Sequence, residues 1–286
     1  MKGILFAGDS FTWGEGLHLY SDLPDVHYNE MGYNSKRYTP AHKDWINANR
    51  FSRRVANHFE TFDLVRYHNG GDNGEIFDFI DNIETEYQRR YVDAQPTPHR
   101  MFTYKLNDFD YIIIQLTDIF RKKVLLPNGK LCNIRSLDSI KDAGFNEYLR
   151  NNFDNKLDNF ISYYLEKFSK EVEYKIKKYE NLGIKKCFIT TWHSDILPFI
   201  KNNSFLNERL ITFYLGDKIV ESIWDLQSLD KISNKYPEMT INQDPYFLKK
   251  NIVATNSHIS LTAHKLIANS IIKKIEENEQ SGLHTI

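Results

Sequence analysis

Four short apolar runs, spaced along the chain, constrain the fold more than any other feature of the sequence. They span Gly3–Ala7, Phe62–Tyr67, Tyr111–Leu116 and Lys186–Thr191. The third, YIIIQL, is uncharged and rich in β-branched residues, which is typical of a strand buried on both faces. All four runs have the length of a strand. They therefore predict four strands of a mostly parallel sheet.

Between these runs, hydrophobic residues recur at helical spacing. The pattern predicts helices over Trp45–Glu60, Phe77–Val92, Asn155–Leu182 and Ser260–Glu277, the third of which ends at Gly183. Alternation of strands and helices predicts a doubly wound α/β fold. We therefore expect three layers, α/β/α, around a mostly parallel, flavodoxin-like sheet.

The long connections favour insertions over a second domain. We expect one domain over residues 1–286, with insertions near 17–43, 121–150 and 204–246. The second insertion contains a pattern for a hairpin that turns at Pro127-Asn128-Gly129. The first is polar and rich in tyrosine, a composition that suits one wall of a carbohydrate cleft.

The charge and the cysteine content limit the kinds of binding partner and the cellular compartment that we expect for this protein. The chain has 37 basic and 38 acidic residues and a net charge of −1, which argues against a nucleic-acid or membrane surface. Cys132 and Cys187 match no zinc or redox spacing, so we expect free thiols. The N-terminal apolar run is too short for a signal peptide, and no run approaches the ~18 residues of a membrane span. These features predict a cytoplasmic protein without a membrane span.

Small or polar residues follow every predicted strand. The carboxyl ends of parallel strands meet at one edge of a sheet, where open α/β sheets bind their ligands. We therefore expect these residues to share one site. The segments are Gly8-Asp9-Ser10, His68–Gly74 (HNGGDNG), Gln115–Asp118 (QLTD), Trp192–Asp195 (WHSD) and, before the last helix, Thr255–His258 (TNSH).

Each of these residues also has a structural interpretation. Serine after a strand commonly caps the next helix, a glycine pair commonly forms a simple turn, and His258 can be a polar loop residue or a cap. His264, one turn into the last helix, is better explained as structural. A dinucleotide fingerprint fails because Leu19 stands where its third glycine belongs, and no phosphate loop is present.

The order of these segments resembles the conserved blocks of the SGNH hydrolases, the GDSL-like esterases and lipases. GDSFTWGEG is similar to the first block, and NGGDNG to the second, with Gly74 at the place of its oxyanion glycine. Gln115-Leu116-Thr117-Asp118 aligns with the third block, Gly-x-Asn-Asp. NSHISLTAHKLIA resembles the last block, with His258 as its histidine.

The resemblance implies a mechanism. Ser10, which follows Asp9 in the first block, would attack an ester carbonyl, and His258 would take its proton. The backbone N–H groups of Ser10 and Gly74 would hold the oxyanion. No metal and no organic cofactor is expected. The remaining polar residues at the ends of the strands are candidates for substrate binding: Asn73, Asp118, Trp192 and His193.

Two positions depart from the family pattern. Thr117 stands where the family has an asparagine that donates to the oxyanion, and a hydroxyl is a shorter, less well aimed donor. Thr255 stands where the family has the acid of Asp-x-x-His, and its neighbour Asn256 is not a carboxylate either. An amide can orient a histidine but cannot stabilise imidazolium by charge. Asp195, at the end of the fourth strand, is the candidate to replace that acid.

The sequence therefore predicts a serine hydrolase that cleaves a short acyl ester, such as an acetyl ester, with a carbohydrate as a candidate alcohol. An O-acyltransferase would use the same residues, so it stays open. So does a binding or structural protein that keeps the fold with weakened catalysis, because of the departures at Thr117 and Thr255.

Overall fold

The computed structural model describes most of the predicted framework. It describes residues 1–9, 12, 14, 17, 40–67, 72–84, 104–118, 121, 123–125, 129, 131–133, 143–215, 217–228, 259 and 261–283. None of the helices in these residues combines the length and the apolar character that a membrane span requires.

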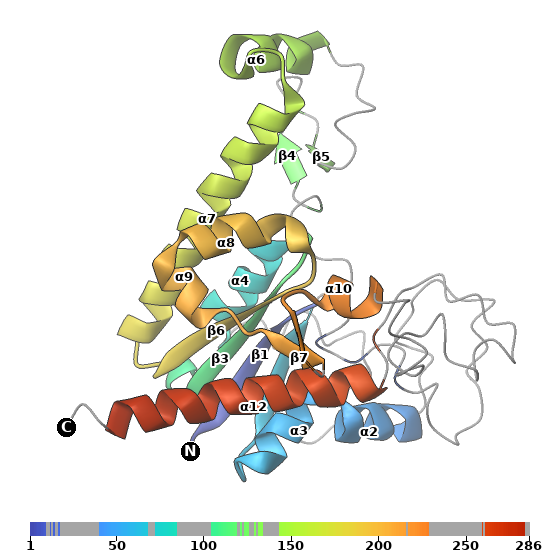
Figure 1. Cartoon of the computed structure of the whole chain (residues 1–286). Helices are drawn as coiled ribbons and strands as arrows, with labels where there is room; N and C mark the ends of the chain where they lie inside the picture. The colour runs from blue at the N-terminus through green and yellow to red at the C-terminus, as the bar shows by residue number, and fades with distance from the viewer. Residues whose placement is uncertain are drawn as a thin grey trace, which may run out of the picture.

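A four-stranded parallel sheet forms the centre of the molecule (Figure 1), in the order β2-β1-β3-β6. The strands are β1 (Gly3–Gly8), β2 (Asp63–Tyr67), β3 (Phe109–Leu116) and β6 (Lys186–Thr191). This confirms all four predicted strands and the parallel sheet. Ala7 pairs with Ile114, which pairs with Ile189, so β1, β3 and β6 end at nearly the same level. Whatever follows these three strands therefore starts at one edge of the sheet.

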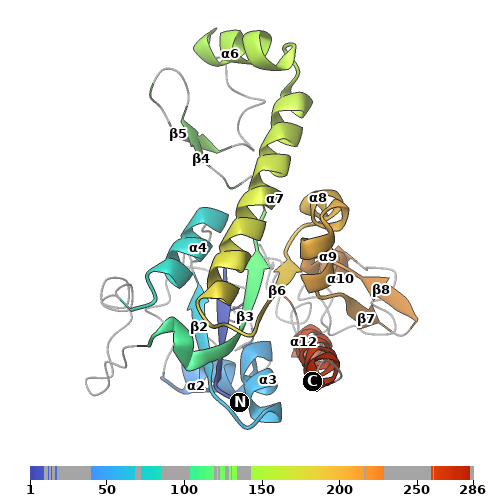
Figure 2. The ribbon, with the colours of Figure 1, turned by 90° about the vertical axis from the view of Figure 1, so that its left-hand side faces the viewer.

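Helices cover both faces, which gives the predicted three-layer α/β/α fold (Figures 1 and 2). Alternate residues of each strand point to opposite faces, so Leu5 and Ile112 enter one core and Phe6 and Ile113 the other. Helices α4 (Asn73–Asp81) and α7 (Leu157–Asn181) pack on the first core. Helices α3 (Phe51–His58) and α12 (Leu261–Leu283) pack on the second.

The single helix predicted over Trp45–Glu60 is wrong, because two helices, α2 (Pro40–Asn49) and α3, meet at Arg50. Arg50 has an extended backbone, with ψ 154°, and its buried guanidinium pairs with Asp63 at the start of β2 at 3.1 Å. The freed N–H of Phe51 donates to Nδ1 of the buried His264 at 3.2 Å. His264 thus has the structural role expected for it, at the start of α3.

The other predicted helices form with different ends. Helix α4 begins earlier than predicted, because Asp72 caps it in a reciprocal capping box with Glu75, and it ends at Asp81. Residues 85–92 of the predicted helix lie outside the described part of the chain. Helix α7 matches its prediction and stops before Gly183, whose φ is +103°. Helix α12 runs six residues beyond the predicted end at Glu277 to Leu283.

A hairpin, a helix and the first turns of α7 form an arm that projects from the sheet (Figure 2). It contains the predicted hairpin, β4 (Lys123–Leu125) paired with β5 (Leu131–Asn133), with Gly129 at φ +81°. Helix α6 (Ala143–Phe153) packs on the first turns of α7 through a small aromatic core that includes Phe145 and Phe160. Pro127 and Asn128 of the predicted turn lie outside the described residues.

The segments that complete the described structure are short. A 3-10 turn, η4 (Leu106–Asp108), precedes β3. After β6 come η7 (Ser194–Ile196), α8 (Leu197–Asn202), α9 (Ser204–Arg209), the antiparallel pair β7 (Phe213–Leu215) and β8 (Lys218–Val220), and α10 (Ile223–Ser228).

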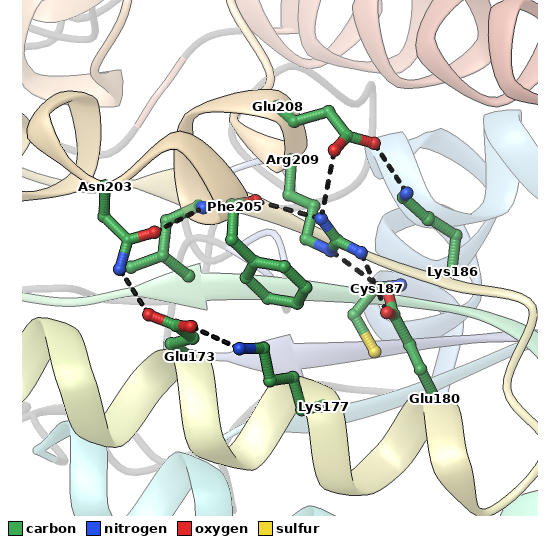
Figure 3. A network of polar contacts seen from close by, with 10 residues as sticks. Glu173, Lys177, Glu180, Lys186, Cys187, Asn203, Phe205, Glu208 and Arg209 are labelled. Carbon is green, nitrogen blue, oxygen red and sulfur yellow. Dashed lines mark hydrogen bonds and ion pairs between the residues drawn. The ribbon is translucent and has the colours of Figure 1, made fainter.

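A polar network joins α9 to α7 and β6 (Figure 3). Arg209 donates from Nε and Nη2 to the two carboxylate oxygens of Glu180, at 3.1 and 2.9 Å. Its guanidinium also lies 3.5 Å from the centre of the Phe205 ring. Glu180 accepts in turn from the backbone N–H of Cys187 at 3.0 Å. Cys187 is fully buried in the core, and this burial raises the pKa of its thiol.

Replacing Arg209 by alanine is expected to lower the free energy of unfolding by about 2–3 kcal/mol, because it leaves a mostly buried carboxylate without its bidentate partner. Chemical denaturation with urea measures this difference. Lys170→Ala is the control, since its ion pair with Glu166 is exposed and screened by solvent and is expected to contribute far less to stability. Equal effects of the two substitutions would contradict the importance assigned to this network.

Candidate active site

A buried carboxylate marks the carboxyl end of β1. Asp9 has no exposed surface, and it is held from three directions by described residues. Its Oδ1 accepts from Gln115 Nε2 at 2.6 Å, and its Oδ2 accepts from Thr117 Oγ1 at 3.0 Å and Arg121 Nη1 at 3.2 Å. A buried carboxylate is stable only when such donors compensate its lost hydration. The network therefore fixes the backbone at the residue before Ser10.

Thr12, which follows β1 in the chain, is tied to the same network. Gln115 accepts from Thr12 Oγ1 at 2.5 Å while it donates to Asp9, so one side chain links Asp9 to Thr12. Gly8 is required by close approach, because a Cβ at this position would lie 2.1 Å from Thr12 Oγ1 and 2.9 Å from Gln115 Cβ. Gly8 at the end of β1 and Gln115 of β3 thus belong to one packing arrangement.

The start of α4 is joined to the end of β3. Asn73 Oδ1 accepts from the backbone N–H of Thr117 at 2.8 Å, and Asn73 Nδ2 donates to the Thr117 carbonyl at 3.0 Å. Asn73 and Gly74 are the first residues of α4 rather than parts of a glycine-rich loop. Among the described residues, the N–H of Gly74 donates to no other group, as expected for the first turn of a helix. This N–H is therefore available to a ligand.

Two further predicted residues of this edge are buried. The Thr117 side chain is 2% exposed, and its hydroxyl donates to Asp9. A hydroxyl has a single proton to donate. The predicted function of Thr117 as an oxyanion donor thus conflicts with the bond it makes here. Asp118 is also buried, at 3% exposed.

Arg121 is the residue of this network that the sequence analysis missed. It lies one turn beyond β3, and its N–H donates to the carbonyl of Asp118 at 3.1 Å. Its side chain is 29% exposed and forms an ion pair with Asp9. The signal in the sequence is an arginine three residues after a strand end rich in polar residues.

A second polar group lies beyond β6. His193 Nδ1 lies 2.9 Å from Asp195 Oδ2, and both side chains are partly exposed. The His193 ring is 5.5 Å from the ring of Trp224, which packs edge-on against Trp192. Trp192 itself is only 6% exposed and belongs to the core. The exposed groups available to a ligand here are thus His193, Asp195 and Trp224.

The structure thus brings Asp9, Asn73, Gly74 and Thr117 together and places His193 and Asp195 at the end of the neighbouring strand. Four predicted site residues lie outside the described part of the chain: Ser10, Thr255, Asn256 and His258.

Comparison with known proteins adds little to this geometry. No family model and no curated protein matches the chain. A solved structure of a carbohydrate esterase, whose active site is described as having divergent catalytic and non-catalytic binding functions, aligns with 96% of this chain at 13% identity and a TM-score of 0.35. The chain spans 65% of the length of that protein. A similarity of this size does not assign an activity to the chain.

Proposed function

We propose that this protein is a serine esterase of the SGNH type. The observation that carries the proposal is the buried network around Asp9, which holds the residue before Ser10 at the carboxyl end of β1. The available N–H of Gly74 supports it, because Asn73 ties the start of α4 to Thr117 of the same network. A serine that directly follows this fixed carboxylate, with an N–H donor supplied by the start of α4, would suit attack on a carbonyl.

In the proposed reaction, Ser10 Oγ attacks the ester carbonyl and gives its proton to His258. The electron pair of the C=O bond moves to the oxygen, which the N–H groups of Ser10 and Gly74 stabilise. Collapse of this intermediate expels the alcohol, which takes the proton from His258 and leaves an acyl-enzyme. Water then repeats the sequence and releases the acid.

The proposed substrate is a short acyl ester such as an acetyl ester, with an acetylated carbohydrate as the candidate alcohol. The exposed Trp224 ring beside His193 offers an aromatic face of the kind on which sugar rings stack. A panel of 4-nitrophenyl esters of increasing acyl length, together with acetylated sugars, tests this proposal. We expect turnover of acetyl esters that declines with acyl length. Absence of turnover of every member by the folded protein would contradict the proposed function.

Asp195 remains our candidate for the acid that supports His258. Its Oδ2 lies against His193, whereas its Oδ1 bonds to no other group among the described residues and can accept from a second imidazole. Asp195→Asn is expected to lower kcat roughly 10²-fold, less than the ~10⁴-fold loss on removing a buried triad carboxylate, because Asp195 is 38% exposed. Steady-state hydrolysis of 4-nitrophenyl acetate measures it, with Asp217→Asn, an exposed carboxylate on the β7–β8 turn, as control. Unchanged turnover of Asp195→Asn would remove Asp195 from the mechanism.

One observation favours another function, a binding protein that has lost efficient catalysis. Thr117 stands where an oxyanion donor is expected, but its hydroxyl proton is already donated to Asp9. That candidate predicts binding of acylated ligands without turnover. The panel above separates the two functions.

A further inference from the structure

One carboxylate oxygen of Asp9 points to a candidate for the third oxyanion donor, the one that Thr117 does not supply. Asp9 Oδ2 accepts two hydrogen bonds, one from Thr117 Oγ1 at 3.0 Å and one from Arg121 Nη1 at 3.2 Å. The two donors are therefore immediate neighbours. One of them, the hydroxyl, has no further proton to give. The other is a guanidinium, which carries five N–H donors.

Most of the donors on Arg121 are still available. Among the residues that the structure describes, Nε and Nη2 of Arg121 bond to no other group, and its side chain is 29% exposed. The ion pair with the fully buried Asp9 restrains the guanidinium and thereby reduces the entropy that a free arginine would lose on binding a ligand. Arg121 is thus a restrained cation with open donors, at the end of the strand on which the family carries its asparagine.

Its neighbours point to the same function. The side-chain amide of Asn73 is directed to the backbone of Thr117, and that of Gln115 joins Asp9 to Thr12. The hydrogen bonds of these two amides hold Thr117, Asp9 and Thr12 in place. Arg121 is the described residue of the network with unused donors that reach solvent.

We propose that Arg121 is a catalytic residue that supplies the third hydrogen bond to the oxyanion, in place of the family's asparagine. This proposal rests on the proposed esterase function. When Ser10 attacks and the C=O electron pair moves to the oxygen, an N–H of Arg121 donates to that oxygen beside the N–H groups of Ser10 and Gly74. A charged donor stabilises an anion more than a neutral amide does, so Arg121 compensates for threonine at position 117. No proton leaves the guanidinium, and the bond is released when the carbonyl re-forms.

The alternative is that Arg121 only neutralises Asp9. The two functions differ in kinetics, because an oxyanion donor acts in the transition state while a structural counter-ion acts on folding. Loss of a donor lowers kcat and leaves KM nearly unchanged. It also weakens binding of a trifluoromethyl ketone, which forms a tetrahedral adduct, without weakening binding of the ground-state ester.

The experiment compares Arg121→Gln with Arg50→Gln in the full chain. Arg50 is a matched control, since its Nη2 pairs with the fully buried Asp63 at 3.1 Å, at the opposite end of the sheet. Both variants are expected to unfold at lower temperature than the wild type. Arg121→Gln is expected to lower kcat for 4-nitrophenyl acetate about 10²–10³-fold with KM within about threefold. It should lose a similar factor in affinity for the ketone. Arg50→Gln is expected to keep kcat within about twofold.

The possible outcomes are distinguishable. A folded Arg121→Gln with kcat within about threefold of the wild type, or with a change in KM alone, overturns the proposal and leaves the esterase function standing. A folded wild type that hydrolyses no ester overturns the function and this proposal together. If Arg121→Gln does not fold, the pair Asp9→Asn and Asp9→Asn/Arg121→Gln, which lacks the uncompensated charge, decides. The double variant must then have the lower kcat by at least about tenfold, and equal values overturn the proposal.

Discussion

Ser10→Ala is expected to lower kcat for acetyl ester hydrolysis by at least about 10⁴-fold, because removal of the nucleophile leaves only binding and oxyanion stabilisation to act on the substrate. The substrate should still bind, so KM, or the dissociation constant measured by calorimetry, should change little. Stopped-flow absorbance with 4-nitrophenyl acetate at high enzyme concentration measures the residual rate.

The matched control is Ser194→Ala, since Ser194 also follows a strand at the carboxyl edge of the sheet but has no assigned function. Its kcat is expected to stay within about threefold of the wild type. Residual activity of Ser10→Ala above about one-tenth of the wild-type rate would show that another group attacks the ester.

His258→Gln is expected to have a second effect of the same order, a loss of about 10⁴-fold or more in kcat, because glutamine can hydrogen-bond but cannot accept a proton from Ser10. The wild-type kcat/KM should fall at acid pH, where the imidazole that accepts the proton of Ser10 is already protonated. In the variant this inflection should disappear. A pH profile from 5 to 9 with a neutral ester measures both changes.

His58→Gln serves as the control for His258→Gln. His58 is an exposed histidine of α3 that contacts Glu276 of α12 at 2.9 Å, so its variant should keep the wild-type profile. If His258→Gln also kept the inflection while losing activity, the titrating base would be another group, with His193 beside Asp195 as the first to examine.

The sequence predicts the sheet well because each buried parallel strand is a short continuous apolar run that can be recognised locally. The YIIIQL run and its three companions are found as β1, β2, β3 and β6, in a parallel sheet. The break between α2 and α3 could not be predicted in the same way. It depends on Arg50 reaching Asp63 and on Phe51 donating to His264, which lies 213 residues away in sequence. Helical periodicity continues through Arg50, so no local pattern marks the break.

The candidate site was predictable only to the extent that topology gathers the ends of the strands. That argument placed Asp9, Gly74 and Thr117 at one edge of the sheet. It could not assign their hydrogen bonds, because the proton of Thr117 is committed by the position of Asp9, 108 residues earlier. Arg121 was missed for the same reason. Its ion pair with Asp9 spans 112 residues and follows no spacing in the sequence.

The most direct test of the account is whether Ser10 is an activated nucleophile. A fluorophosphonate reacts with a serine whose proton is accepted by a neighbouring base and leaves ordinary serines unmodified. Intact-protein mass spectrometry after incubation of the folded wild type should show one adduct, and peptide mapping should place it on Ser10, with no adduct on Ser10→Ala. An unmodified wild type, or an adduct on any other residue, would contradict the account.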